Sequence, residues 1–468
     1  MFEKKTKIIC TISDINCEVD FIRELFENGM NVARINSAHA NIEGAQRIVD
    51  NIRQISDKIA ILIDTKGPEV RLTAMESSVG FLVDVGDIIK IKNGVDLLCN
   101  QQTLYTNCPN FVEDLTLGAH ILIDDGAMDL LVLDKKDETL ICQVGNKGLI
   151  KGKKSINVPG VHISLPSLTQ KDISFIKWAI DAKIDFIAHS FVRSKDDLFE
   201  IQTILDKYSS TIKIISKIEN QVGVDNLDDI LSHCYGVMIA RGDLGVEIPA
   251  EKIPYIQKQM VEKCRARKKP VIIATQMLHS MIENPRPTRA EVTDVSNAIY
   301  QSTDAIMLSG ETANGKYPVE AVKTMCKIAK ESEKYIEVKL DVNLEKVVKP
   351  IAAVLARSIV KATTEIPIKA IIFDTWTGRT GRYLAEFRPK VPIFAMCYND
   401  STMRELALSY DVWSYKFDIQ KSKEDFVVNS ISILKKKGHI KSGDIVGFIG
   451  GSFNDELGAT YVEFKYVE

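Results

Sequence analysis

Charged side chains follow several short apolar runs of the sequence, where burial is costly unless a partner is present. In KIISKIE, residues 213–219, Lys217 and Glu219 end an otherwise apolar segment. Residues two apart on a strand point to the same face, so both charges would share one face with Ile215. Burying them costs several kcal/mol per ion. They form either a structural ion pair or part of a site that binds a phosphoryl group and a metal ion.

Polar residues also stand at the ends of five other apolar runs. They are Arg34 and Asn36; Asp64, Thr65 and Lys66; Arg241, Gly242 and Asp243; Thr275 and Gln276; and Ser309, Gly310 and Glu311. Glu219 and Asp243 are hard oxygen ligands of the kind Mg²⁺ accepts. Arg34 and Lys217 are cations suited to the charge of a transferring phosphoryl group. Thr275 offers a hydroxyl for a substrate oxygen or for proton relay.

Eight apolar runs, separated mostly by segments of helical spacing, would have to bring these residues together. The runs are residues 7–12, 31–36, 60–65, 185–191, 213–219, 236–241, 270–275 and 305–310. The helical segments are residues 18–29, 42–55, 171–182, 196–208, 251–269 and 319–330. Eight such units favour a closed (β/α)8 barrel over an open doubly wound sheet. The carboxyl ends of the strands in a barrel converge on one site.

Two stretches break this rhythm and predict further domains. Strand-like segments at residues 85–92, 120–125, 129–135 and 138–145 are separated by turn signals. We assign residues 69–165 to a small inserted β-barrel lid, which leaves the barrel with residues 1–68 and 166–340. Residues 341–468 read as an open α/β domain, with a helix over 344–362 and strands at 370–375, 391–396, 412–417 and 444–450.

The composition narrows the class of protein. A net charge of −3 gives no general basic surface for nucleic acid or membrane. There is no apolar stretch near the ~20 residues that a membrane helix needs. Nine cysteines without a CxxC pair indicate free thiols in a reducing cytoplasm.

No glycine-rich phosphate loop of the P-loop or protein-kinase type occurs in the sequence. A nucleotide would therefore need another surface. The inserted segment offers Arg71 near its start and Lys153 and Lys154 near its end. The alternative for the KGKK run is a solvated stretch of charge.

Long segments of the chain resemble pyruvate kinase. They are TKIICTI, MNVARIN, IDTKGPEVR, IISKIENQVGV, MIARGDLGVEIP, ATQMLHSMIENPRPTRAEVTDVSNAI and DAIMLSGETANGKYPVEAV. The resemblance implies a barrel, an inserted lid and a C-terminal α/β domain. It also implies transfer of a phosphoryl group between phosphoenolpyruvate and ADP, giving pyruvate and ATP. A homotetramer is implied by the family alone.

Residue roles follow from this resemblance. Lys217 would stabilise the phosphoryl group in transit, while Glu219 and Asp243 would hold Mg²⁺ or Mn²⁺. Arg34 would bind phosphate. The substrate carboxylate would meet the turn formed by Ala240, Arg241 and Gly242, and Thr275 would contact it and assist protonation of the enolate. Residues along the ADP path would be Asn36, His39, Arg71 and Lys154. A monovalent cation, K⁺, would be held by Asn36, Asp64 and Thr65.

Departures from the family pattern bear on regulation and on the monovalent ion. Ala38 replaces a serine that would coordinate K⁺, and His279 replaces a glutamate. The loop TWTGRT resembles an effector phosphate site formed by Thr375, Thr377, Gly378, Arg379 and Thr380. Asp455 and Glu456 in the last loop would repel a second phosphate, so we expect weak activation by a bisphosphorylated sugar.

Two other functions remain open at this point. Another barrel enzyme acting on phosphoenolpyruvate or pyruvate, such as a metal-dependent aldolase or lyase, would need neither the lid nor the ADP-facing cations. A catalytically silent sensor would not need Lys217, Glu219, Asp243 and Thr275 together.

Overall fold

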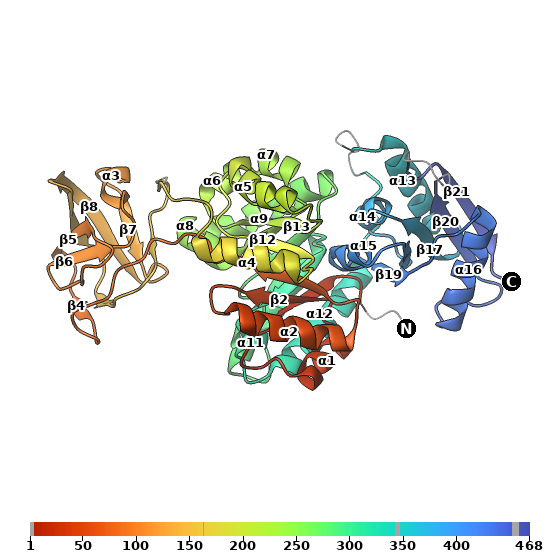
Figure 1. Ribbon diagram of the computed structural model, residues 1–468, viewed down its shortest axis with the longest axis horizontal. Helices are drawn as coiled ribbons and strands as arrows, with labels where there is room; N and C mark the ends of the chain where they lie inside the picture. Colours follow the sequence, from red (N-terminus) through yellow and green to blue (C-terminus); the bar gives the residue numbers. More distant parts are fainter. Residues whose placement is uncertain (1–3, 162, 342–346, 452–457) are drawn as a thin grey trace.

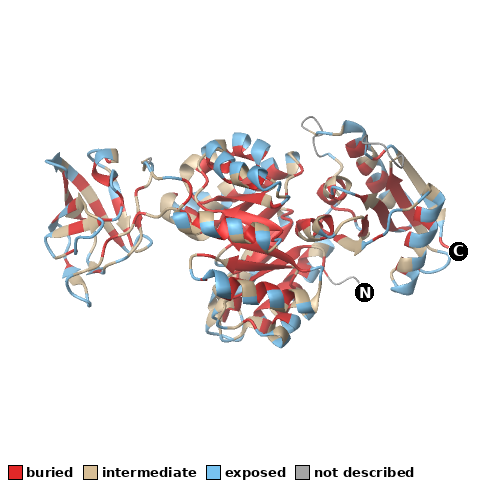
Figure 2. Ribbon diagram, in the orientation of Figure 1, coloured by how far each residue is buried: buried red, intermediate tan, exposed pale blue. Residues whose placement is uncertain are grey.

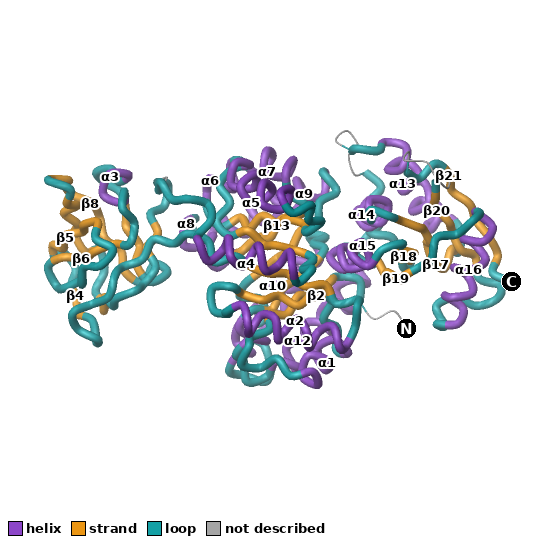
Figure 3. The backbone as a smooth tube through the Cα atoms, viewed as in Figure 1, coloured by secondary structure: helices purple, strands orange, loops and turns teal. Residues whose placement is uncertain are grey.

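Three bodies follow one another along the long axis of the molecule (Figure 1). The computed structural model describes residues 4–161, 163–341, 347–451 and 458–468. The barrel lies in the middle, the inserted β domain projects from one end, and the C-terminal domain packs at the other (Figure 1). The order of strands and helices within each body can be followed in Figure 3.

The central body is a closed barrel of eight parallel strands, as the sequence predicts. Around the barrel the order is β1-β16-β15-β14-β13-β12-β3-β2. The bounds are β1 Lys7–Thr11, β2 Val32–Asn36, β3 Ala60–Asp64, β12 Phe186–His189, β13 Lys213–Ile218, β14 Gly236–Ala240, β15 Val271–Ala274 and β16 Ala305–Leu308. Nearly every residue in these strands is buried (Figure 2). Branched apolar residues fill them because barrel strands are covered on both faces.

Seven of the eight predicted barrel strands end one or more residues earlier than expected, and the last residue of two of these runs begins a short helix. Arg241 does not belong to β14 but begins the short helix α8, Arg241–Glu247, which the sequence interpretation treated as a glycine-rich turn. Gly310 likewise begins α11, Gly310–Ala313, directly after β16. The last pair of residues between β14 and β15 is Ala240 and Ala274. After Ala240 the chain continues directly into α8.

Amphipathic helices surround the barrel. They are α1 Val19–Glu27, α2 Ile42–Ile55, α4 Gln170–Asp181, α5 Lys195–Lys207, α6 Gln221–Asp225, α7 Leu227–His233, α9 Ile253–Ala266, α10 Arg289–Tyr300 and α12 Pro318–Ser332. Capping boxes fix the starts of α4, α5 and α10. In α4 the box joins Thr169 to Asp172, and Asp172 also accepts a hydrogen bond from the backbone N–H of Lys66 at 2.8 Å. This helix start thereby positions the chain that leaves β3 toward the site.

The inserted domain is a curled six-stranded sheet with a separate two-stranded sheet. The larger sheet has the order β11-β7-β8-β9-β5-β6, and β10 pairs with β4 in the smaller one. Bounds are β4 Phe81–Val83, β5 Ile88–Asn93, β6 Thr103–Thr106, α3 Phe111–Asp114, β7 His120–Ile123, β8 Met128–Lys136, β9 Thr139–Val144, β10 Gly148–Ile150 and β11 Ile156–Asn157. Its apolar cluster is separate from the barrel's and runs from Val70 to Leu165. The assigned bounds of 69–165 stay a prediction.

The C-terminal domain has a five-stranded sheet of order β19-β18-β17-β20-β21. Its elements are α13 Pro350–Glu365, β17 Ile368–Thr375, α14 Arg379–Glu386, β18 Ile393–Cys397, α15 Asp400–Glu405, β19 Val412–Lys416, α16 Lys423–Lys436, β20 Ile445–Gly450 and β21 Tyr461–Tyr466. The first helix begins at Pro350, a residue type that is favoured in the first turn. Its predicted start, and the loop with Asp455 and Glu456, lie outside the described residues.

Buried charges join the C-terminal domain to the amino ends of the barrel strands. Arg388 is completely buried and pairs with Asp304, just before β16, at 3.0 Å. Arg404 pairs with Asp185, just before β12, at 2.6 Å. Removing one partner of such a pair would leave a buried charge uncompensated, so these contacts fix how the two bodies dock. Among the helices described, none is long and apolar enough to cross a bilayer.

Candidate active site

A cleft of about 740 Å³ lies where the carboxyl ends of the barrel strands face the inserted domain. The barrel side carries most of the predicted site residues. The lining residues include Arg34, Asn36, His39, Asp64, Thr65, Lys66, Ser190, Phe191, Lys217, Glu219 and Asp243 from the barrel, and Glu69, Arg71, Thr73, Asn107 and Lys153 from the inserted domain. Residues from five strand ends and from the inserted domain therefore meet at one cavity, as barrel geometry requires.

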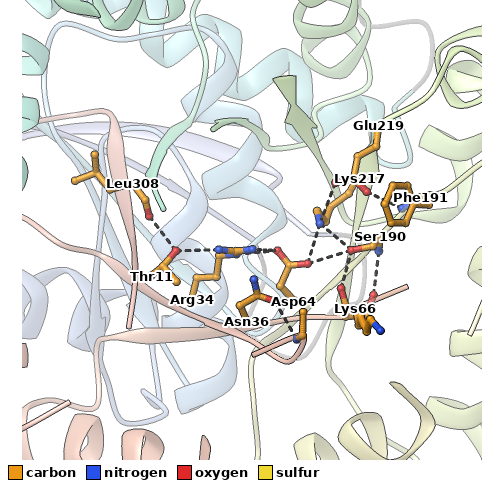
Figure 4. A network of polar contacts seen from close by, with 12 residues as sticks. Thr11, Arg34, Asn36, Asp64, Lys66, Ser190, Phe191, Lys217, Glu219 and Leu308 are labelled. Atoms are coloured by element: carbon orange, nitrogen blue, oxygen red, sulfur yellow. Dashed lines mark hydrogen bonds and ion pairs between the residues drawn. The ribbon is translucent and has the colours of Figure 1, made fainter. Parts of the chain in front are cut away.

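Asp64 lies at the centre of the polar network in this cleft (Figure 4). One of its oxygens, Oδ2, accepts hydrogen bonds from the guanidinium of Arg34 at 2.7 Å. The other oxygen, Oδ1, is 3.0 Å from Nζ of Lys217. Burial opposes ionisation of Asp64, but the two cations outweigh it and hold its pKa below the ordinary value. The Asp64 carboxylate therefore orients both cations expected to meet a phosphoryl group.

Lys217 is buried among oxygen atoms. Its Nζ lies 3.0 Å from Oε1 of Glu219 and donates to Oγ of Ser190 at 2.7 Å. Burial favours the neutral amine, yet the charges of Asp64 and Glu219 raise the pKa of Lys217 above its usual value. The ammonium is consequently charged and fixed in place. The Lys–Glu pair is thus an ion pair and also part of an open cleft, so the two interpretations of KIISKIE are compatible.

The negative charges of Glu219 and Asp243 are opposed mainly by burial of the two carboxyl groups. Burial raises the pKa of Glu219 to about 7; the charge of Lys217 opposes this shift and that of Asp243 adds to it. Burial also raises the pKa of Asp243. No group of three or more metal-ligating side chains occurs in the part of the chain that the structure describes. Two adjacent hard carboxylates fit Mg²⁺, which takes few protein ligands and keeps water and substrate oxygens.

Thr275 and Arg241 form a second polar group beside the cleft. Oγ1 of Thr275 accepts a hydrogen bond from the backbone N–H of Gly242 at 2.7 Å. Arg241 donates to the carbonyl of Thr275 at 2.8 Å and pairs with Asp294 at 2.7 Å. Thr275 has φ 67° and Gln276 has φ 57°, a left-handed conformation that costs of order 1–3 kcal/mol per residue. These contacts hold the strained turn at Thr275 and Gln276, which follows β15. Ala240, the last residue of β14, pairs with Ala274 just before this turn.

Three of the four predicted nucleotide residues, Asn36, His39 and Arg71, line the cleft, and Lys154 does not. Arg71 lines the cleft and pairs with Glu69 at 2.7 Å. His39 lines it as an exposed side chain. Lys154 is turned to Asp124 of the inserted domain at 2.9 Å, and Lys153 is the lysine of this pair that lines the cleft.

The oxygen atoms predicted to hold K⁺ already have partners. Oδ1 of Asn36 accepts from the backbone N–H of Ala38 at 3.0 Å. Oγ1 of Thr65 accepts from the backbone N–H of Ser190 at 3.0 Å. All three predicted ligands, Asn36, Asp64 and Thr65, nevertheless line the cleft. Ser37, the neighbour of Ala38, is buried and does not line the cleft.

The predicted effector loop lies in the C-terminal domain, away from the cleft. Oγ1 of Thr375 accepts hydrogen bonds from the backbone N–H groups of Thr377 at 3.2 Å and Gly378 at 2.8 Å. Gly378 has φ 70°, and Arg379 and Thr380 begin α14.

Sequence reasoning missed the contributions of β1 and β12. Thr11 accepts a hydrogen bond from Arg34 at 3.0 Å, and Ser190 contacts Lys217. The backbone N–H of Phe191 donates to Glu219 at 2.7 Å. The polar residues at the ends of the runs 7–12 and 185–191 were the available signal. Glu311, in contrast, binds the backbone of Leu278 and Ser309 and lies outside the cleft.

Comparisons with known proteins agree with this geometry. The barrel domain of pyruvate kinase matches residues 3–322, and the alpha/beta domain of pyruvate kinase matches residues 353–461. The pyruvate kinase of Borreliella burgdorferi is 46% identical, covering 100% of this chain and 98% of its own length. That of Bacillus licheniformis is 41% identical, covering 99% of this chain and 80% of its own.

A solved structure gives the same result. The crystal structure of a pyruvate kinase from Cryptosporidium parvum superposes with a TM-score of 0.94 at 34% identity, covering 100% of this chain and 97% of that one. The matches extend over barrel, inserted domain and C-terminal domain, and they confirm the resemblance seen in the sequence. This chain belongs to the pyruvate kinase family and is a phosphotransferase.

Proposed function

We propose that the chain transfers the phosphoryl group of phosphoenolpyruvate to ADP, giving pyruvate and ATP, with Mg²⁺ and K⁺ as cofactors. The observation that carries the proposal is the position of Lys217. Its ammonium is fixed by Asp64 and Glu219 at the barrel side of a cleft whose other wall holds Arg71 and Lys153. A donor phosphoryl bound at the barrel and an acceptor phosphate bound at the lid would meet beside this ammonium.

Each side chain has a defined task in the proposal. Arg34 and Lys217 bind the phosphoryl oxygens and offset the charge that builds up during transfer. Backbone N–H groups at the start of α8 receive the substrate carboxylate. Thr275, whose Oγ1 accepts a hydrogen bond from the backbone N–H of Gly242, would assist protonation of the enolate. Glu219 and Asp243 would hold the divalent cation, which supplies positive charge to substrate oxygens when bound.

A coupled assay of ADP-dependent pyruvate release tests the proposal directly. We expect turnover that requires phosphoenolpyruvate, ADP and a divalent cation together. A lyase or aldolase would consume its substrate without ADP, and a silent sensor would bind ligand without turnover. Either result would replace the proposed reaction.

The homotetramer, which rests on the family alone, and the cytoplasmic location, which rests on the pattern of nine cysteines, are part of the same proposal. Light scattering of the purified protein would measure the mass of the assembly. A mass of one or two chains at assay concentration would reject the tetramer.

Asp243→Asn is expected to weaken divalent binding by about tenfold or more. The substitution removes one unit of negative charge close to the ion, and about 1.4 kcal/mol corresponds to a factor of ten. Titrating Mg²⁺ against activity measures the half-saturating concentration. Asp228→Asn is a matched control, because Asp228 is an exposed carboxylate that pairs with Lys263 outside the cleft. Equal Mg²⁺ half-saturation in Asp243→Asn and the wild type would make Asp243 structural.

Potassium is expected to activate the enzyme, at a lower half-saturating concentration in Ala38→Ser than in the wild type. A serine hydroxyl would add one neutral oxygen beside Asn36. Asp64 is neutralised by Arg34 and Lys217, and Glu69 by Arg71, so a restored ligand should strengthen the site without changing its charge. Activity is measured against K⁺ in tetramethylammonium buffer. Full activity of the wild type without K⁺ would contradict the expectation.

A further inference from the structure

A second cleft, of about 350 Å³, lies between the barrel and the C-terminal domain. Its barrel wall is formed by the end of α7 and by the chain that connects α9 to β15, and its other wall by α14. Its lining includes Tyr235, Arg267, Lys268, Lys269, Arg379 and Arg382. Tyr235 precedes β14 and Asp243 follows it, so the second cleft is at the opposite end of the barrel from the active site. Figure 1 shows α14 on the side of the barrel away from the lid.

The lining of this cleft is strongly positive. Five of its lining residues are arginine or lysine, and none of the lining residues that the structure describes is an aspartate or glutamate. Arg267 has an acidic partner outside the cleft, Asp228, at 2.9 Å. Within the described ranges, the guanidinium of Arg379 makes no hydrogen bond or ion pair. Among the described residues, Lys269, Arg379 and Arg382 have no carboxylate partner, because Lys269 and Arg382 donate only to neutral oxygen atoms.

Burial and neighbouring cations both lower the pKa of two lysines that line the cleft. Burial lowers the pKa of Lys268 to about 8, with Glu386 opposing the shift and Arg357 and Arg265 adding to it. Burial likewise lowers the pKa of Lys269, and the charges of Arg382 and Arg267 lower it further. An anion in the cleft would remove part of this repulsion.

The positively charged groups are held in place before any ligand arrives. Arg382 lies over the ring of Tyr235 with its guanidinium carbon 5.0 Å from the ring centre. It also donates to the hydroxyl of Tyr235 at 3.3 Å and to the carbonyl of Thr377 at 3.2 Å. Nζ of Lys269 donates to the carbonyl of Cys234 at 2.7 Å. Fixed donors lower the entropy cost of binding.

We propose that this cleft binds a small phosphate monoester. A phosphate dianion with three acceptor oxygens matches converging guanidinium and ammonium groups. The volume is that of a small-molecule site. Tyr235 and Tyr383 provide apolar surface for the organic part of the ligand.

Such a ligand would connect the two bodies. Arg267 and Lys269 reach it from the barrel, and Arg379 and Arg382 from the C-terminal domain. Arg379 also belongs to the predicted effector loop, but Thr377 and Thr380 do not line the cleft. The inferred site is thus distinct from that loop, and its binding does not depend on the proposed reaction.

Titration calorimetry in Mg²⁺-free buffer tests the site. Inorganic phosphate, a nucleoside 5′-monophosphate and a hexose 6-phosphate are the probes, and their relative affinities identify the organic part of the ligand. We expect Lys269→Gln and Arg379→Gln each to weaken binding by about tenfold. Lys263→Gln removes the same charge from α9 outside the cleft and is expected to bind like the wild type. Lys217→Met removes a cation from the active site and should leave this binding event unchanged.

Several outcomes would overturn the site. They are unchanged affinity in both Lys269→Gln and Arg379→Gln, loss of binding in Lys217→Met alone, and no binding of any probe to the wild type at millimolar concentration. Loss in Arg379→Gln and Thr377→Val with full binding by Lys269→Gln would place the phosphate in the loop instead. Thermal unfolding without ligand checks that each variant is folded; if Lys269→Gln is not, Arg267→Gln is its replacement on the same wall.

Discussion

Lys217→Met should lower kcat by about a thousandfold or more while changing the KM for phosphoenolpyruvate only modestly. Removing one preorganised charged donor from a reacting group typically costs this much. Methionine fills similar space but cannot offset the charge of a phosphoryl group. Arg34 remains to bind the ground-state phosphate, so transition-state stabilisation falls more than substrate affinity. Steady-state kinetics with both substrates varied would measure the two parameters separately.

Lys213→Met is the matched control for this prediction. Lys213 stands on the same strand, β13, but at the opposite end of the barrel, where it pairs with Glu405 at 3.5 Å. The same substitution there should leave kcat within a few-fold of the wild type. The substitution removes the positive charge that pairs with Asp64 and Glu219. Circular dichroism and thermal unfolding would show whether Lys217→Met still folds without it. A folded Lys217→Met protein with near-normal kcat would refute the role of this lysine.

Much of the barrel could be predicted because buried parallel strands leave a strong signal. All eight apolar runs form strands of the barrel. Strand pairing stops near the ends of each run. Four strands of the inserted domain, β5, β7, β8 and β9, were predicted, but the strands β4, β6, β10 and β11 were not. In β4 and β10, Leu82 is 68% exposed and Leu149 is 37% exposed, so neither strand shows the alternation of a half-buried sheet. The edge strand β21 was missed for a related reason: its residues are mostly half-buried.

The site was predictable residue by residue but not contact by contact. Strand ends in a barrel converge, so Arg34, Asp64, Lys217 and Glu219 could be placed together from their positions alone. Which cation each carboxylate would meet depends on rotamers and register, and the sequence does not contain that information. The K⁺ role of Asp64 stays a prediction, and the contacts of its oxygens with Arg34 and Lys217 could not be read from the sequence. Lys153 and Lys154 are adjacent in sequence, yet only Lys153 lines the cleft.

The inserted domain has the features of a separately folding lid. Its apolar cluster is distinct from those of the barrel. It is joined to the barrel by two connectors, each with a glycine in the left-handed region: Gly67 with φ 69° and Gly160 with φ 74°. At Gly67 a Cβ atom would lie 2.9 Å from Ser190 and Phe191, so the connector passes tightly against β12. Two connectors, of which the one at Gly67 is tightly packed, and a separate core are consistent with a body that moves as one unit.

Replacing residues 69–165 with a short flexible linker should therefore leave a folded barrel that cannot phosphorylate ADP. The excision removes Arg71 and Lys153, the lid cations that line the cleft, but keeps Arg34, Lys217 and Glu219. Phosphoenolpyruvate should still bind at the barrel, although more weakly in a site now open to water. Calorimetry would measure that binding, and the coupled assay would measure phosphoryl transfer.

The double variant Arg71→Gln/Lys153→Gln in the intact chain separates the charge of the lid from its presence. If the lid acts mainly through these cations, the double variant should raise the KM for ADP strongly and keep part of kcat. If it acts mainly by excluding water, the double variant should remain active and only the excised chain should lose transfer. In both cases the excised chain is inactive toward ADP. A folded, excised chain that still forms ATP would show that the barrel alone positions both substrates and that residues 69–165 are not a catalytic lid.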